Sequence, residues 1–238
     1  MCGRFAITLS PQAMAALFRT LNVLDLVPRY NVAPTQPVAA IWEVSGRREG
    51  HFARWGLVPG WVKDPRDFPL LVNARVETMA EKPAFRDALK HGRCIIPASG
   101  YYEWHTGPDK TKQPYYITFA DDRPMALAGF YTSWMGPEGE EVDTVATITV
   151  PANGQVGEVH HRMPAILEGE AIDQWLDVLN VRAHEAAQLA LPLAEGALKF
   201  HPVSRRVNSA RDDDPGLIVP AEVEKPEPKK GKAQLDLF

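Results

Sequence analysis

The chain has 238 residues, of which 45% are hydrophobic and 24% are charged, and its formal net charge is −4 at pH 7. This composition is typical of a globular protein with one main domain, and the negative charge excludes a surface that coats DNA uniformly. Any contact with nucleic acid must therefore come from a local basic cleft. No apolar run approaches the roughly 18 residues of a membrane span, and no signal peptide is recognisable, which predicts a cytoplasmic protein without membrane contact.

The elements in chain order predict an α+β fold in which strands outnumber helices. Ser10 and Pro11 are typical of a helix start, and the apolar residues that follow at helical spacing predict one buried face. That face comprises Met14, Leu17, Phe18 and Leu21. Further helices are expected at 78–89, where Pro83 delays the start, and at 169–179 and 182–192.

Short segments of alternating apolar residues, bounded by Pro, Gly and Asp, predict the strands. These segments are Val38–Val44, His51–Leu57, Tyr115–Phe119, Met125–Tyr131, Thr144–Val150 and Leu198–Val203. Their pattern favours a curved, mainly antiparallel sheet system within a single domain over residues 2–220, and it gives no support for a doubly wound parallel sheet.

Cys2 is the most informative residue of the chain. Removal of Met1 would leave an α-amine and a thiol on one residue, and such an amine has a pKa of about 7.7–8.0, so much of it is unprotonated at neutral pH. A 1,2-aminothiol adds to an aldehyde as an imine, after which the thiol closes a thiazolidine ring. It can also act as an acyl-transfer nucleophile with its own base. The other cysteine, Cys94, is expected to be buried in a strand, so the Cys2 thiol should be free.

Three further segments carry candidate chemical groups. Asn73, Arg75 and Glu77 alternate along the chain, so an extended backbone would point all three side chains to one face. Glu103 lies between aromatic residues, where desolvation would raise its pKa and suit it to proton transfer. His160 and its neighbour His161 lack the additional ligands that a metal site needs, and we expect no metal.

The composition changes after Pro220. Residues 221–233 are rich in Lys, Glu and Pro and have too little apolar surface to fold, which predicts a disordered linker. The chain then ends in Gln234-Leu235-Asp236-Leu237-Phe238, a pentapeptide that resembles the motif by which bacterial proteins bind the sliding clamp.

Seven motifs occur in the order that is found in one protein family. They are Met1-Cys2-Gly3-Arg4-Phe5, Arg29-Tyr30-Asn31-Val32-Ala33-Pro34-Thr35, Trp55-Gly56-Leu57-Val58-Pro59-Gly60-Trp61, Asn73-Ala74-Arg75-Val76-Glu77-Thr78, Gly100-Tyr101-Tyr102-Glu103-Trp104, His160-His161-Arg162-Met163-Pro164 and His201-Pro202-Val203-Ser204. In these motifs residues 2 to about 220 resemble the SRAP family, the SOS-response-associated peptidases, and the resemblance implies a barrel-like β core with several short helices.

The resemblance implies a self-crosslinking reaction at abasic sites in single-stranded DNA, in the context of the SOS response to DNA damage. Cys2, freed of Met1 by autopeptidase activity, would form a thiazolidine with the opened deoxyribose in lyase-like chemistry. Glu103 matches the acid/base glutamate, His160 the catalytic histidine, and Asn73 the amide that orients the cysteine end.

The same resemblance implies a DNA-binding surface. Arg4, Arg75 and Arg162 match phosphate-binding arginines, and Thr149 matches a backbone contact. Pro34 and Trp61 match apolar surfaces against unstacked bases. Two residues depart from the family pattern: Trp61 is followed by Val62 where some relatives have a second Trp, and His161 stands where relatives often have an acidic residue.

Two other functions remain open from the sequence. A glutamine-amidotransferase-like hydrolase with an N-terminal nucleophile also begins Met-Cys-Gly, although Arg4 stands where such enzymes have an aliphatic residue and the chain leaves no room for a synthase domain. A noncatalytic reader of modified bases would not need Cys2. No cofactor is expected, and the partners implied are single-stranded DNA and, through residues 234–238, the sliding clamp, for a monomer that is associated with the nucleoid or replication fork.

Overall fold

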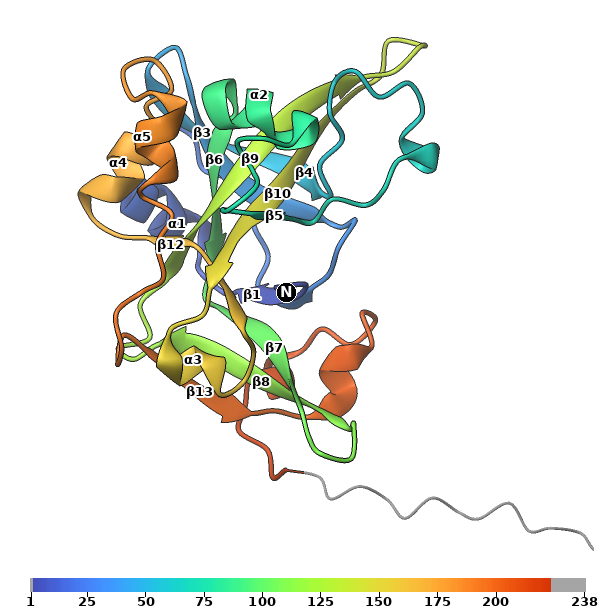
Figure 1. Cartoon of the computed structure of the whole chain (residues 1–238), viewed down its shortest axis with the longest axis vertical. Coiled ribbons are helices and arrows are strands. Elements are labelled where there is room, and N and C mark those ends of the chain that lie inside the picture. The colour runs from blue at the N-terminus through green and yellow to red at the C-terminus, as the bar shows by residue number, and fades with distance from the viewer. Residues whose placement is uncertain (1, 224–238) are drawn as a thin grey trace, which may run out of the picture.

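Five strands close into a barrel that forms the centre of the protein (Figure 1). The computed structural model describes residues 2–223. The barrel strands, in spatial order, are β10 (Glu141–Pro151), β4 (Arg47–Trp55), β3 (Pro37–Val44), β6 (Arg93–Ala98) and β9 (Met125–Met135). β10 completes the ring because it pairs with β4 in parallel on one side and with β9 antiparallel on the other. The remaining barrel pairings are antiparallel.

Three short strands extend the barrel wall. They are β5 (Asn73–Arg75), β11 (Arg162–Pro164) and β12 (Ile166–Leu167). β5 and β11 both pair with β10, β5 in parallel through Thr147 opposite Asn73 and β11 antiparallel through Thr149 opposite Pro164. Two motifs that are far apart in the sequence are thereby brought to one strand.

A second, five-stranded sheet lies beside the barrel. Its strands, in spatial order, are β13 (Leu198–Pro202), β8 (Lys112–Phe119), β7 (Gly100–Thr106), β1 (Phe5–Ile7) and β2 (Arg29–Val32). All of its pairings are antiparallel. Figure 1 shows this sheet below the barrel, with the start of the chain between the two. Cys2 lies where the two sheets meet, because it precedes β1 of the second sheet and its carbonyl oxygen accepts a hydrogen bond from Asn73 of β5.

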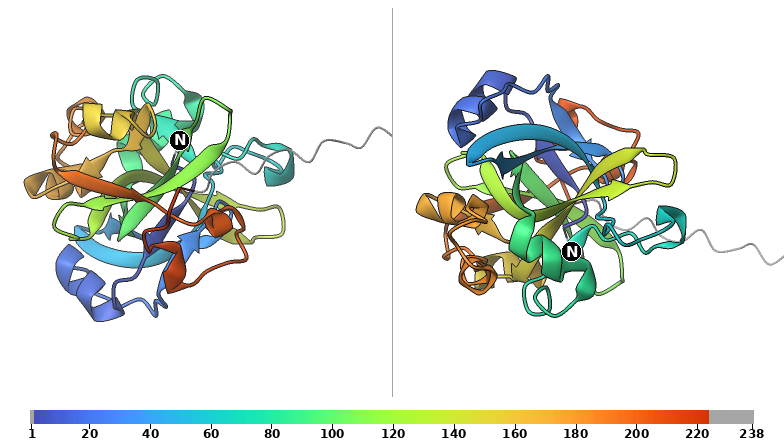
Figure 2. Two further views of the ribbon diagram at one scale, coloured as in Figure 1. Left: turned by 90° about the horizontal axis from the view of Figure 1, so that it is seen from below. Right: turned by 90° about the horizontal axis from the view of Figure 1, so that it is seen from above.

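The helices are short and lie outside the barrel (Figures 1 and 2). The α-helices are α1 (Pro11–Phe18), α2 (Pro83–His91), α3 (Gly154–Gly157), α4 (Glu170–Leu176) and α5 (Ala183–Ala187), and the 3₁₀ turns are η1 (Pro65–Asp67), η2 (Arg205–Asn208) and η3 (Pro215–Leu217). α2 and α4 pack against β6, and α2 also contacts β9. None of the helices within residues 2–223 combines the length and the apolar character that a bilayer crossing demands.

The predicted apolar face of the first helix was only half correct. Ser10 caps the helix through a hydrogen bond from Ala13 N–H to its hydroxyl, and Met14 and Phe18 are buried as expected. Leu17 and Leu21, however, are 50% and 64% exposed. The helix ends at Phe18, and Arg19 turns the backbone into the left-handed region at φ 57°, so Leu21 leaves the face that the spacing assigned to it.

The α+β class and the mainly antiparallel sheets are confirmed, and the six predicted strands are all present with shifted ends. The delayed start of the helix predicted at 78–89 is confirmed, because α2 begins at Pro83, where a missing amide hydrogen costs nothing at the first helical position, and it continues to His91. The helices predicted at 169–179 and 182–192 were too long and shrink to α4 and α5. Most of the linker 221–233 and all of the pentapeptide 234–238 lie outside the described residues.

Candidate active site

The backbone of Cys2 is held by Asn73. The Asn73 Nδ2 group donates to the Cys2 carbonyl oxygen over 2.8 Å, and the Thr147 hydroxyl donates to Asn73 Oδ1 over 2.5 Å. Because the hydroxyl accounts for the oxygen side of the amide, the nitrogen side must face Cys2. The parallel pairing of β5 with β10 places Thr147 opposite Asn73, so the barrel wall fixes the cysteine end of the chain.

Glu103 and His160 form an acid/base pair beside Cys2. The Glu103 side chain on β7 is 3% exposed, and its Oε1 lies 3.7 Å from Nδ1 of His160, within ion-pair range. Burial raises the pKa of Glu103 above its ordinary value, whereas burial lowers the pKa of His160. Both shifts favour the uncharged forms. The raised pKa brings the Glu103 carboxyl closer to neutral pH, where it can exchange protons, and the lowered pKa keeps His160 a neutral imidazole.

The Cys2 thiol is fully buried and unpaired with any other cysteine. Burial, and to a lesser degree the nearby negative charge of Glu103, raise its pKa to about 12. The sulfur therefore carries its proton at neutral pH and needs a base within the site before it can act as a nucleophile.

A pocket of about 420 Å³ opens onto the acid/base pair from the surface. Its lining residues are Glu103, Trp104, Thr106, Lys112, His160 and Asn208. Among residues 2–223, no three His, Cys, Asp or Glu side chains gather into a group that could hold a metal ion. The metal-free site remains a prediction.

Arg4 connects the N-terminal strand to the C-terminal part of the domain. One of its guanidinium nitrogens donates to Asn31 Oδ1 over 2.7 Å and to the Val207 carbonyl oxygen over 2.8 Å. Burial lowers the pKa of Arg4. In this structure Arg4 braces the strand that follows Cys2, and its predicted role as a phosphate ligand stays a prediction.

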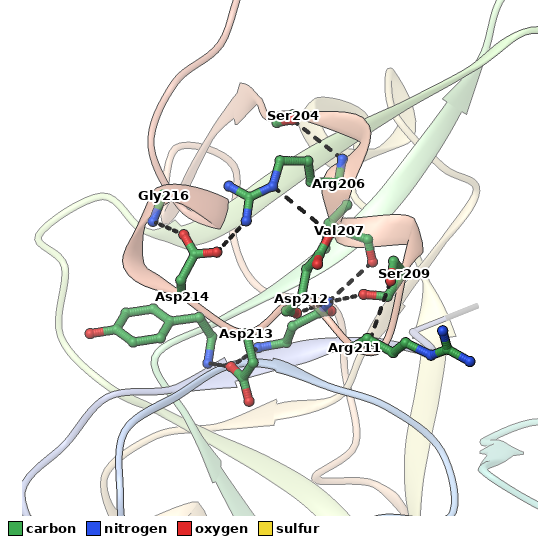
Figure 3. Close-up of polar contacts among 11 residues, drawn as sticks. Ser204, Arg206, Val207, Ser209, Arg211, Asp212, Asp213, Asp214 and Gly216 are labelled. Carbon is green, nitrogen blue, oxygen red and sulfur yellow. Dashed lines mark hydrogen bonds and ion pairs between the residues drawn. The ribbon is translucent and has the colours of Figure 1, made fainter.

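The segment 204–216 is itself fastened to β2, as Figure 3 shows. Asn31 is fully buried, and its Nδ2 donates to the carbonyl oxygens of Ser209 and Asp212 over 2.9 and 2.7 Å. Asp213 Oδ1 accepts hydrogen bonds from the Tyr30 and Asn31 amides over 2.5 and 3.1 Å. The segment that braces Arg4 is thus a rigid part of the site.

Arg162 is buried and already has an anionic partner. Its guanidinium pairs with both carboxylate oxygens of Glu77, and Nη2 also donates to the Thr149 carbonyl oxygen over 2.6 Å. The Arg162 side chain is 9% exposed, whereas that of Glu77 is 45% exposed. Thr149 is fully buried, so its side chain supports Arg162 from within the barrel wall. β5 ends at Arg75, which places Glu77 in the following turn and not on the predicted continuous strand face.

The other predicted DNA contacts lie on the surface. Arg75 is exposed and makes no ion pair with residues 2–223. Trp61 is 59% exposed in the loop after β4 and rests edge-on against Phe68, with ring centroids 5.5 Å apart. Pro34 is half-buried in the loop between β2 and β3. Val62, which departs from the family pattern, is buried beside Trp134 and is not available for stacking.

Sequence analysis missed the residues that support the site. Thr147 is an ordinary strand residue in the sequence, and nothing marked it as the partner of Asn73. Asn31 belongs to a quoted motif, but its role depends on carbonyl groups about 180 residues away, at 207–212. The one signal of this role in the sequence was the position of Asn31, a polar residue between Tyr30 and Val32.

Comparison of the sequence with protein-family models identifies the family of the chain. The model described as SOS response associated peptidase (SRAP) matches residues 1–210. The chain belongs to the SRAP family.

Several SRAP proteins are similar to the chain over nearly its whole length. The abasic site processing protein YoqW of Bacillus subtilis is 36% identical over 92% of this chain and 99% of its own length. The abasic site processing protein YedK of Escherichia coli is 33% identical over 92% of this chain and all of its own. A crystal structure of a protein from Bacteroides thetaiotaomicron superimposes with a TM-score of 0.83 at 28% identity, over 92% of this chain and 100% of the other. The SRAP fold is therefore confirmed by sequence and by structure.

The arrangement in this SRAP chain suits nucleophilic addition at Cys2 with general acid/base assistance. A pinned backbone holds the residue, a buried carboxyl lies close to its thiol, and an imidazole lies beside that carboxyl. Two of the arginines, Arg75 and Arg162, lie on strands that both pair with β10, β5 and β11 respectively.

Proposed function

We propose that this protein processes abasic sites in single-stranded DNA by forming a covalent crosslink through Cys2. The observation that carries the proposal is the hydrogen bond from Asn73 to the Cys2 carbonyl, which holds the residue beside the Glu103–His160 pair. The names of the relatives YoqW and YedK, both abasic site processing proteins, support the choice of lesion.

The reaction begins after Met1 has been removed. The α-amine of Cys2 attacks C1′ of the ring-opened deoxyribose, the C1′ oxygen leaves as water, and an imine remains. The Cys2 sulfur then adds to the same carbon, the C=N electron pair passes to nitrogen, and the thiol proton ends on that nitrogen. The product is a thiazolidine, and no oxidant or cofactor is needed.

Glu103 and His160 would divide the proton transfers between them. A carboxyl with a raised pKa can give a proton while the sugar ring opens and take one from the thiol before ring closure. His160 would protonate the departing oxygen. Such assistance contributes typically about 10²–10⁴-fold to a rate.

The DNA strand would be bound mainly through its phosphates. Arg75 is exposed at the surface, and Arg162 becomes available when a phosphate displaces Glu77. Trp61 offers an exposed aromatic face for an unstacked base, and Pro34 a smaller one, as single-strand binding requires. Arg4 and Thr149 would act from beneath this surface by holding β1 and Arg162.

The decisive experiment measures intact protein mass after incubation with an abasic single-stranded oligonucleotide. Wild-type protein should gain the mass of the oligonucleotide in a heat-stable adduct, and Cys2→Ala should not. Cys2→Ser keeps the amine and should give only an imine that borohydride can trap. The matched control is Cys94→Ala, which removes the other buried thiol and should form the adduct like the wild type.

Three outcomes would contradict the proposal. A serine variant with an equally durable linkage would exclude the thiazolidine. Glutamine hydrolysis without an adduct would favour the amidotransferase-like hydrolase. Undiminished binding of modified bases by Cys2→Ala, with no adduct from the wild type, would favour the noncatalytic reader.

The family is described as a family of peptidases, and for this protein we propose only one peptidase reaction, the removal of its own Met1. A variant in which Met1 cannot be removed should form neither imine nor thiazolidine, because the α-amine would remain in a peptide bond. Mass analysis of purified Glu103→Gln protein would test self-processing, since retention of Met1 is expected only if Glu103 assists the cleavage.

The C-terminal residues suggest that the protein is recruited to replication forks through the sliding clamp. We expect the recruited protein to be a monomer. Gln234, Leu237 and Phe238 have the chemistry of a clamp-binding motif, with an amide for the pocket rim and two apolar side chains for its interior. The 13 residues 221–233, if extended, would reach roughly 40 Å.

A fluorescent peptide of the last ten residues should bind the bacterial sliding clamp at about micromolar strength, and replacing Leu237 and Phe238 with Ala should abolish binding. Deletion of the tail should leave crosslinking in vitro intact, and clamp binding by neither peptide nor full protein would refute the recruitment.

A further inference from the structure

Tyr101 carries a buried hydroxyl group that makes no hydrogen bond within residues 2–223. The residue is fully buried, and among the described residues its oxygen has no hydrogen-bond partner. The neighbouring Tyr102 is equally buried, but its hydroxyl donates to the Tyr30 carbonyl oxygen over 2.7 Å. Buried hydroxyl groups are normally paired, so the exception at Tyr101 calls for a partner that arrives during function.

The strand register directs Tyr101 towards the reactive end of the chain. Side chains alternate along β7, so Tyr101 and Glu103 lie on one face and Tyr102 on the other. Tyr101 packs in the main core together with Cys2, whereas Tyr102 belongs to the smaller cluster beneath η2 and η3. Tyr101 also pairs across the sheet with Phe5, three residues after Cys2.

The surroundings keep the Tyr101 hydroxyl protonated. Burial raises its pKa well above the ordinary value, and the negative charges of ionised Cys2 and Glu103 raise it further. The group is therefore a hydrogen-bond donor in the same core cluster as Cys2 and on the same face of β7 as Glu103, the two residues whose side chains change charge during ring closure.

We propose that the Tyr101 hydroxyl donates a hydrogen bond to the Cys2 sulfur while the sulfur adds to the imine carbon. In that step the thiol gives its proton to Glu103, the S–C1′ bond forms, the C=N electron pair moves to nitrogen, and Glu103 returns the proton to that nitrogen. The sulfur is anionic between these events, and a hydrogen bond to an anion is stronger than one to a neutral atom. This inference rests on the proposed crosslinking function.

The role is separable from folding, because the hydroxyl makes no hydrogen bond within the described part of the resting protein. Tyr101→Phe keeps the ring and removes only the unpaired oxygen. Replacing an unpaired buried polar group by an apolar one is neutral or stabilising, so the variant should melt at or above the wild-type temperature.

The experiment follows both covalent species over time with an abasic single-stranded oligonucleotide. Aliquots treated with borohydride report the imine, and heat-stable adduct without borohydride reports the thiazolidine. Tyr101→Phe should form the imine at the wild-type rate and convert it to thiazolidine at least fivefold more slowly. The matched control is Tyr102→Phe, which loses the bond to Tyr30 and should melt lower while it converts the imine at the wild-type rate.

Two outcomes would overturn the role of Tyr101. One is an unchanged conversion rate in Tyr101→Phe, and the other is a slowing of both steps together with a lower melting temperature, which would indicate a structural role. If wild-type protein forms no covalent species at all, the proposed function itself fails, and this result is distinguishable because it precedes any comparison of variants.

Discussion

Two ends of the barrel each contain a buried cysteine and a buried arginine, and only one end is arranged for chemistry. Arg93 and Cys94 lie together on β6 under the helices, and Cys2 and Arg162 lie where the two sheets meet. Burial raises the pKa of Cys94 with no contribution from a charged neighbour, whereas that of Cys2 also responds to Glu103. Equal burial of the same residue therefore gives an inert thiol at one end and a thiol with an adjacent acid/base group at the other.

The two buried arginines, Arg93 and Arg162, differ in the same way as the two cysteines. Arg93 donates to the carbonyl oxygens of Leu89, Trp175, Asp177 and Val181, all of which belong to the fold. Arg162 shares its charge with the half-exposed carboxylate of Glu77, which a phosphate can replace. Permanent partners indicate a structural role, and a partner that can leave indicates a binding role.

The largest effect is expected for Glu103→Gln. Loss of the acid/base group should slow crosslinking about 100-fold, while the variant should be more stable than the wild type above the raised pKa of Glu103. Because that pKa is raised in the folded protein, the carboxyl is neutral in acid and must carry a buried charge once the pH exceeds it. The wild type loses stability as the pH rises from the ordinary carboxyl pKa through the raised one, and the glutamine variant does not. Melting curves between acidic and alkaline pH should diverge in this direction, and parallel curves would contradict it.

The two arginines should respond in opposite ways to the same substitution. Arg93→Gln leaves carbonyl groups unsatisfied and should lower the free energy of unfolding by about 3 kcal/mol, without changing crosslinking per folded molecule. Arg162→Gln should slow crosslinking alike for all flanking sequences, because phosphates carry no base information. It should also reduce the salt slope of single-strand binding by about 0.7. Denaturant unfolding and salt titrations measure the two effects.

A smaller effect is expected for Asn73→Ala. The variant loses the hydrogen bond to the Cys2 carbonyl, and a loss of about 1.4 kcal/mol in positioning corresponds to a tenfold slower reaction. Thr147→Val serves as the graded control, because it frees the Asn73 amide without removing it. Single-turnover rates should rank wild type above Thr147→Val above Asn73→Ala, and any other order would argue against positioning by Asn73.

The smallest effect is expected for Glu77→Gln. Removing the carboxylate that occupies Arg162 should raise affinity for intact single-stranded DNA by about threefold, or roughly 0.7 kcal/mol. Glu81→Gln, an exposed neighbour, changes the net charge equally and should have less effect. Fluorescence anisotropy at one salt concentration measures both, and equal gains would mean that net charge alone is responsible.

Sequence patterns predicted six of the thirteen strands within residues 2–223, because alternation is a local property. Cys94 was expected in a buried strand and is fully buried in β6. The helix ends were less predictable, since the left-handed Arg19 that ends α1 and exposes Leu21 has no strong local signal such as a glycine. The closed barrel was beyond local patterns, because the ring depends on β10 pairing with both β4 and β9.

In the candidate site, too, some features could be predicted from the sequence and others could not. Motifs identified Cys2, Asn73, Glu103 and His160, and the structure brings Asn73 to Cys2 and Glu103 to His160. The partners that hold them could not be read from the sequence, because Thr147 reaches Asn73 only through strand pairing. The hydroxyl of Tyr101 also became informative only when its neighbours were known.

The brace between Arg4 and Val207 has a consequence for biosynthesis. The two residues are 203 positions apart, so the hydrogen bond that holds the N-terminal strand can form only after almost the whole domain has been translated. At about 5–20 residues per second, that interval lasts on the order of 10–40 s. During this time the first residues of the nascent chain lack these final partners, so Met1 stays accessible until folding buries Cys2.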